Sequence, residues 1–191
     1  MAKGFRKTRR GVSAKLDAGE RTLLAHLFVE VWELLGGTDG GEGGDLAGAN
    51  VDPLEAMVGI GTATVEPADP ALARLLPSAH REDDEVAAEF RRYTEQGLRA
   101  RKRAGLETAR QTLGRDGALE LDRAEAAAWV VALTDVRLVI GERLGLRTDE
   151  EAQALTDSLA ELDEDDPRAF LVAIYDFLTW LQESLVRALS G

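Results

Sequence analysis

The sequence predicts an all-α protein, a single-domain helical bundle with one small β-hairpin near the N-terminus as its only strand candidate. Three observations support this prediction. Apolar residues recur at helical spacing through most of the 191 residues. Asp-x-x-Glu and Asp-Pro pairs mark helix starts. Alternating strand patterns are scarce. At this length we expect one domain over residues 1–191, and the chain is long enough to bury a core.

The basic N-terminal segment, residues 1–16, contains the strand candidate. Apolar and polar residues alternate there after Gly11, and this alternation predicts a small hairpin. Asp17 and Glu20 then have the spacing of a capping box. An apolar stripe behind them predicts a helix that ends at Gly36, because glycine commonly follows the last helical turn.

The next stretch, residues 36–48, holds seven glycines in thirteen residues and predicts a flexible loop. Two short helices are expected after it, Pro53–Val58 and Pro70–Leu76, each opened by an Asp-Pro pair. A long helix should then run from Asp83 to Leu113. Its two internal glycines each cost about 1 kcal/mol relative to alanine, so we expect a kink or a division into two helices.

The C-terminal part of the chain predicts three more helices. Their starts are marked by Asp122 with Glu125, by Thr148 with Glu151, and by Pro167. The helix that carries Trp129 and the last helix are apolar on more than one face, so we expect them to pack together as the core. Apolar surface that one chain leaves uncovered would favour a homodimer.

The composition excludes several classes of protein. The chain has no cysteine, so it has no disulfide framework, thiol catalysis, Cys-ligated zinc or thiol redox switch. The apolar C-terminal stretch is interrupted by Asp176, Glu183 and Arg187 and does not predict a membrane span. The basic N-terminus lacks the apolar run of a secretory signal, and we therefore expect a cytoplasmic protein.

Recognisable catalytic and ligand-binding motifs are absent from the sequence. The glycine-rich loop lacks the Gly-Lys-Ser/Thr ending that would reach a phosphate. His26 and His80 lie on different segments, and neither has a second histidine or a cysteine at i+3 or i+4, whereas a metal site needs three or four convergent ligands. We therefore predict no cofactor, no metal and no enzymatic activity. An enzyme with an unrecognised carboxylate site is the alternative.

The formal net charge of −12 is distributed unevenly. Residues 1–21 carry seven Lys and Arg against two acids, whereas residues 116–191 carry six against seventeen. Affinity for phosphate backbones is largely electrostatic, so the basic regions are the candidate partner-binding surface. The candidate residues are Arg6, Lys7, Arg9 and Arg10 in the N-terminal segment, and Arg99, Arg101, Lys102 and Arg103 on the long helix. Salt bridges within the chain are the alternative role for the second group.

Two charged residues, Asp135 and Arg137, lie inside the apolar Trp129 helix. Burying a charge is costly unless the charge is paired. We therefore expect a structural ion pair or an exposed pair at the edge of the helix, with Glu183 or Arg187 on the last helix as a candidate partner.

Four segments of the chain resemble one protein family. They are Asp69–Pro77, Glu89–Arg103, Trp129–Gly141 and Tyr175–Leu189. The family is an actinobacterial family of unknown function that includes AosR, the accessory oxidative stress regulator, and its members are often encoded beside the adaptor of the Clp protease. The resemblance implies a mostly helical cytoplasmic protein and, for some members, a role in transcription under oxidative stress. It implies no catalytic residue, and without cysteine this chain has no thiol with which to sense an oxidant.

Two function hypotheses follow. The first is a non-enzymatic regulatory protein that binds DNA or an acidic protein, such as a sigma factor, through its basic residues. The second is an adaptor-type interaction module linked to Clp proteolysis, which only the gene neighbourhood of the family suggests.

Overall fold

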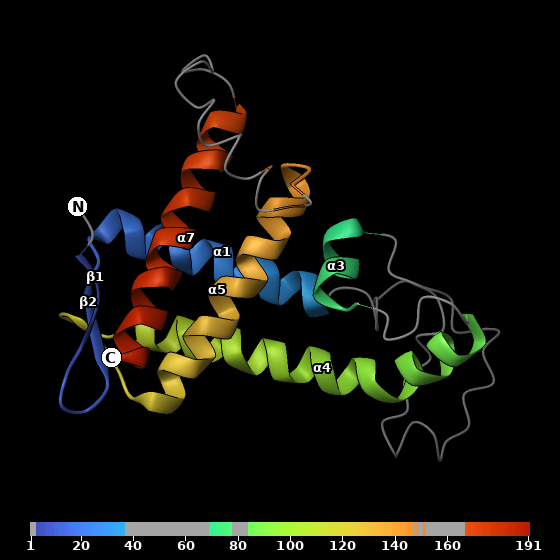
Figure 1. The fold of residues 1–191 in the computed structure, drawn as a ribbon, viewed down its shortest axis with the longest axis horizontal. Helices are drawn as coiled ribbons and strands as arrows, with labels where there is room; N and C mark the ends of the chain where they lie inside the picture. The colour runs from blue at the N-terminus through green and yellow to red at the C-terminus, as the bar shows by residue number, and fades with distance from the viewer. Residues whose placement is uncertain (1–2, 37–68, 78–83, 147, 149–150, 152–166) are drawn as a thin grey trace.

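The computed structural model describes residues 3–36, 69–77, 84–146, 148, 151 and 167–191. Within these residues the chain forms five helices and a small antiparallel sheet (Figure 1). The predicted all-α bundle with an N-terminal hairpin is confirmed. The expected helix at Pro53–Val58, the loop after Gly36 and most of the helix expected after Thr148 lie outside the described residues.

The elements follow one another in this order: β1 (Lys3–Lys7), β2 (Val12–Lys15), α1 (Ala18–Gly36), α3 (Pro70–Leu75), α4 (Asp84–Leu113), β3 (Leu119–Leu121), α5 (Arg123–Arg143) and α7 (Pro167–Ser190).

The helices begin where the capping residues predict. The Glu20 backbone N–H donates to Asp17 Oδ1 over 3.0 Å, and the Asp17 N–H donates back to Glu20 Oε2 over 2.8 Å. This reciprocal pair satisfies two N–H groups that a first helical turn leaves without partners. The same arrangement occurs at Asp122 with Glu125 and at Thr148 with Glu151.

The hairpin belongs to a three-stranded sheet in the order β1-β2-β3. Its loop is closed by a hydrogen bond of 2.8 Å from the Thr8 N–H to the Gly11 carbonyl. The third strand was not predicted. Leu119 and Leu121 of β3 are buried against the core while Glu120 between them is exposed, which is the alternation of a half-buried strand. At three residues this pattern is too short to separate from a loop.

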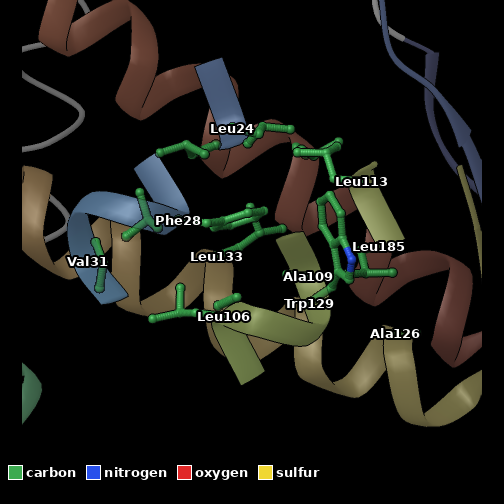
Figure 2. Packing of buried hydrophobic residues seen from close by; sticks show 14 of the residues in the cluster. Leu24, Phe28, Val31, Leu106, Ala109, Leu113, Ala126, Trp129, Leu133 and Leu185 are labelled. Carbon is green, nitrogen blue, oxygen red and sulfur yellow. The ribbon is translucent and has the colours of Figure 1, made fainter. Parts of the chain in front are cut away.

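Trp129 of α5 is fully buried and joins the sheet to the helices. Its ring meets Phe5 of β1 and Phe28 of α1 edge-on, with centroids 5.8 and 5.4 Å apart. Its Nε1–H donates to Thr112 Oγ1 of α4 over 2.8 Å. Figure 2 shows the Trp129 indole beside Leu185 of α7. The expected packing of α5 with α7 is confirmed, and the core also includes α1, α4 and the sheet.

Helix α4 is one continuous helix of 30 residues, so the expected division does not occur. Packing explains why its glycines are tolerated. Gly105 faces α5, where an added Cβ would lie 3.9 Å from the Ala128 carbonyl oxygen, and Gly97 faces open space. The contacts of α4 with α1 and α5 outweigh the modest propensity cost of two glycines.

Helix α7 is apolar beyond the face that it buries. Leu178, Leu181 and Leu185 are fully buried, whereas Phe170 is 66% exposed and Trp180 is 42% exposed. By length and composition, α7 is the one helix of the described chain that could cross a membrane. A helix that packs into a protein core meets the same criterion.

Candidate interaction surface

Most of the predicted basic cluster on the long helix is engaged inside the bundle. Arg99 is buried, and its Nε and Nη2 donate to Glu95 Oε1 over 3.0 and 2.7 Å. Its Nη1 donates to the Leu35 carbonyl over 3.0 Å, which satisfies an acceptor in the last turn of α1. The Arg103 guanidinium lies 3.9 Å from the ring centroid of Trp32. Arg101, the remaining arginine of the cluster, is exposed on α4.

Lys102 of α4 forms an ion pair with Asp135 of α5. The Asp135 side chain is only 1% exposed, and burial raises the pKa of this carboxyl group while Lys102 opposes the rise. The expected ion pair is therefore found, but the expected partner was wrong. Glu183 and Arg187 face each other on α7, 3.8 Å apart and largely exposed.

Arg137 ties α5 to α7. Its Nη1 donates to Gln182 Oε1 over 2.6 Å, and its Nη2 donates to the Tyr175 hydroxyl over 3.2 Å. Gln182 in turn donates to the Val130 carbonyl and to Thr134 Oγ1. The charged residues of the apolar helix thus stabilise two helix interfaces, one with α4 and one with α7.

The N-terminal candidates are placed differently. Arg6, Lys7, Arg9 and Arg10 are exposed, as are Lys3 and Lys15 on the same two strands. These six residues, which we call the hairpin surface, form no side-chain hydrogen bond or ion pair within the described part of the chain. The sequence predicted that both basic groups bind a partner. In the structure, most of the α4 group is engaged within the bundle, whereas the hairpin group forms no ion pair with a described residue.

The hairpin is fixed to the core rather than hanging free. The Phe5 N–H donates to Ser184 Oγ of α7 over 3.0 Å, and the Phe5 ring packs against Trp129. Gly4 permits this contact, because an added Cβ would lie 2.9 Å from the Ser184 side chain. In Figure 1 the hairpin loop lies at one end of the molecule, beside the C-terminal end of α7. The cations therefore project from a rigid support.

The sheet register places the cations in rows across the outer face. Lys3 lies opposite Lys15, and Arg6 lies opposite Ser13. Ser13 also lies opposite Glu120 of β3, so the acidic residue of this row is on the far strand. The basic part of the outer face therefore follows β1, β2 and the loop between them.

Two hollows border these elements. One, of about 510 Å³ beside the hairpin loop, is lined by Arg10, Arg115 and Asp116 among others, and Arg115 is held by a hydrogen bond of 2.5 Å to Glu125. The charges in this hollow are of both signs, which favours neither a cation nor an anion.

The other hollow, of about 390 Å³, lies between α1 and α4 over Phe28, Trp32 and Leu106. The Arg110–Glu107 pair stands at its rim, and the hydrogen bonds from Arg110 lower the pKa of Glu107 to about 2. His26 is exposed on α1, whereas His80 lies outside the described residues. Within the described ranges, no three acidic or histidine side chains converge as metal ligands.

Comparison with known proteins places the chain in a family. The model of a family described as "Domain of unknown function (DUF2017)" matches residues 2–189. This chain belongs to the DUF2017 family. The match spans nearly the whole chain and confirms the resemblance that the sequence indicated.

Relatives of this DUF2017 protein have been named from mycobacteria. Proteins of Mycobacterium bovis and Mycobacterium tuberculosis called "Oxidative stress regulator AosR" are 33% identical to it over 157 residues, which cover 73% of this chain and 67% of theirs. A Mycobacterium leprae protein called "Putative oxidative stress regulator AosR" is 32% identical over 154 residues, with the same coverage. No solved structure matches the chain.

Proposed function

We propose that this DUF2017 protein is a non-enzymatic cytoplasmic regulator of the stress response that acts by binding another macromolecule at its hairpin surface. The observation that carries the proposal is the contrast between two sets of cations. The cations Arg99, Lys102 and Arg103 are engaged within the bundle, whereas those of the hairpin surface are exposed and form no ion pair with a described residue. The names of the mycobacterial relatives supply the biological setting, which is oxidative stress.

The lack of cysteine shapes the proposed mechanism. A thiol–disulfide switch requires at least one cysteine, and this chain has none. The protein therefore acts as a binding component, and the stress signal reaches it through the abundance or state of its partner. The anchoring of the hairpin suits this role, because its backbone is already ordered and need not be ordered on binding.

Complementation of a strain that lacks this protein tests the proposal. The strain would receive the wild-type chain, the variant Arg6→Gln/Lys7→Gln/Arg9→Gln/Arg10→Gln, or a control. The control, Arg110→Gln/Arg143→Gln, removes two exposed cations that already pair with carboxylates on the helices. Transcript levels and survival would be measured before and after exposure to peroxide.

The wild-type chain and the control should restore the transcriptional response, and the hairpin variant should not. The far-UV circular dichroism and melting temperature of the purified hairpin variant should equal those of the wild type, since its four side chains are exposed and form no hydrogen bond or ion pair in the described fold. An unchanged response in the strain without the protein, or full rescue by the hairpin variant, would overturn the proposal. Altered protein half-lives with unchanged transcripts would indicate the Clp-adaptor alternative instead.

A further inference from the structure

The hairpin surface concentrates charge of one sign. Residues 3–15 hold six Lys and Arg and no acid. Elsewhere in the described chain, Arg110, Arg115 and Arg143 pair with carboxylates, whereas Arg101 and Arg123 are exposed and form no ion pair with a described residue. The neighbouring carboxylates, those of Asp116, Glu120 and Asp122, lie on the β3 side of the hairpin, and charges farther away are largely screened because the Debye length at physiological salt is about 8 Å. Cations that gather in this way without an ion pair to a described residue favour an anionic partner.

The side chains around these cations indicate which kind of anionic partner. The apolar residues of the two strands, Phe5, Val12 and Ala14, are all buried, and the remaining exposed position of the hairpin is Thr8. Protein–protein interfaces depend on a desolvated centre of aromatic and apolar side chains, and they are depleted in charge there. Interfaces with nucleic acid are more polar and far more positively charged. The hairpin surface therefore fits nucleic acid better than an acidic protein.

The placement of the hairpin allows contact with duplex DNA from one side. The hairpin forms one edge of a three-stranded sheet whose inner face packs on the core, so its outer face and its loop are the parts that can lie along a duplex. At a strand rise of about 3.3 Å per residue, β1 spans about 13 Å from Lys3 to Lys7, or roughly four base pairs at 3.4 Å each. The opposed pair Lys3–Lys15, with Arg6 on β1, places cations on both strands of the outer face, where they can contact phosphates of a duplex that lies across it.

We infer that the hairpin surface binds duplex DNA through its phosphate backbone. The inference rests on the proposed function and names the class of its partner. Lys3, Arg6 and Lys15 on the outer face and Arg9 and Arg10 in the loop make the contacts. Because phosphates carry no sequence information, binding through these residues has little sequence preference.

Fluorescence anisotropy with a labelled 30-base-pair DNA duplex tests the inference on the full chain. Each cation–phosphate contact contributes about 0.9 to the slope of log K against log salt concentration. The variant Arg9→Gln/Arg10→Gln should therefore flatten the slope by about 1.8, which reduces the loss of affinity between 50 and 200 mM KCl by about 12-fold. The control Arg110→Gln/Arg143→Gln carries the same change in net charge and should keep the wild-type slope.

Competition distinguishes DNA from an acidic protein. Unlabelled duplex should displace the labelled duplex at a far lower concentration of negative charge than poly-L-glutamate does. Equal displacement per charge, absence of DNA binding at 50 mM KCl, or an equal loss of slope in the control would overturn the inference. In those cases the proposed function stands if the hairpin variant still fails in the complementation assay. If that variant rescues fully, both fail.

Discussion

The buried Lys102–Asp135 ion pair should be tolerated in the folded protein only while both partners are present. Removing one partner of a buried ion pair typically destabilises a protein by about 3–5 kcal/mol, because a charge remains buried without compensation. Here that charge is deeply buried. Asp135 is 1% exposed, and its second oxygen, Oδ2, already lacks a hydrogen bond. Lys102→Met should therefore lower the free energy of unfolding by about 3–5 kcal/mol.

A second substitution separates the cost of the unpaired charge from the loss of the contact. Replacing a whole buried ion pair with apolar residues of similar volume is often neutral or stabilising. The double variant Lys102→Met/Asp135→Leu should therefore recover most of the stability that the single variant loses. Urea unfolding followed by far-UV circular dichroism at pH 7 measures both values. A single variant within about 1 kcal/mol of the wild type, or a double variant no more stable than the single, would refute this reasoning.

The pH dependence provides an independent check of the same pair. Burial raises the pKa of Asp135 in the folded state above its ordinary value. Protonated Asp135 therefore favours folding at low pH, and that contribution is lost as the pH rises through the raised pKa. Without Lys102 to oppose it, the rise should be larger. The stability deficit of Lys102→Met should thus shrink as the pH falls from 7 toward the ordinary Asp pKa of about 3.9. A deficit that does not change with pH would contradict this account of the pair.

Three further substitutions test the fold by urea or thermal unfolding. Thr112→Val leaves the buried Trp129 N–H without its acceptor and should cost about 1–3 kcal/mol, and no measurable loss would contradict that hydrogen bond. Asp122→Ala removes the cap of α5 and should cost about 1 kcal/mol, or roughly 2–4 °C in Tm, whereas an unchanged Tm would rule out a stabilising cap. Gly11→Ala would place a Cβ 2.0 Å from the Leu121 carbonyl oxygen, so it should destabilise the protein by about 1–3 kcal/mol. Wild-type stability of this variant would show that β2 and β3 are not so close.

The helices could be predicted because their signals are local. Asp17, Asp122 and Thr148 each satisfy N–H groups within three residues, so the sequence alone shows the cap. The apolar stripe of α1 is likewise complete within one segment, and the structure buries Leu24, Phe28, Val31 and Leu35 as that stripe requires.

The roles of the charged residues could not be predicted, because they depend on contacts between segments that are distant in the sequence. Lys102 and Asp135 are 33 residues apart and meet only because α4 packs against α5. The contact of Arg103 with Trp32 depends in the same way on the crossing of α1 and α4. The Glu95–Arg99 pair is the exception, since its i,i+4 spacing could have indicated a salt bridge within the helix.

The hairpin surface was predicted as a basic segment, but its significance was not visible in the sequence. Both basic groups have similar charge density, and only the structure shows that Arg99 and Lys102 are engaged while Arg9 and Arg10 are not. The attachment of the hairpin to α7 could not be predicted either, because Phe5 and Ser184 are 179 residues apart in the sequence.

Backbone ¹H–¹⁵N spectra recorded during titration with a 30-base-pair duplex at 50 mM KCl test the central claim most directly. The claim is that the unpaired cations of the hairpin, and not the engaged cations of α4, meet the partner. Chemical-shift changes should concentrate in residues 3–15 and be small in residues 99–103. Changes centred on α4 or α7, or a spectrum unaffected by the duplex, would contradict the claim.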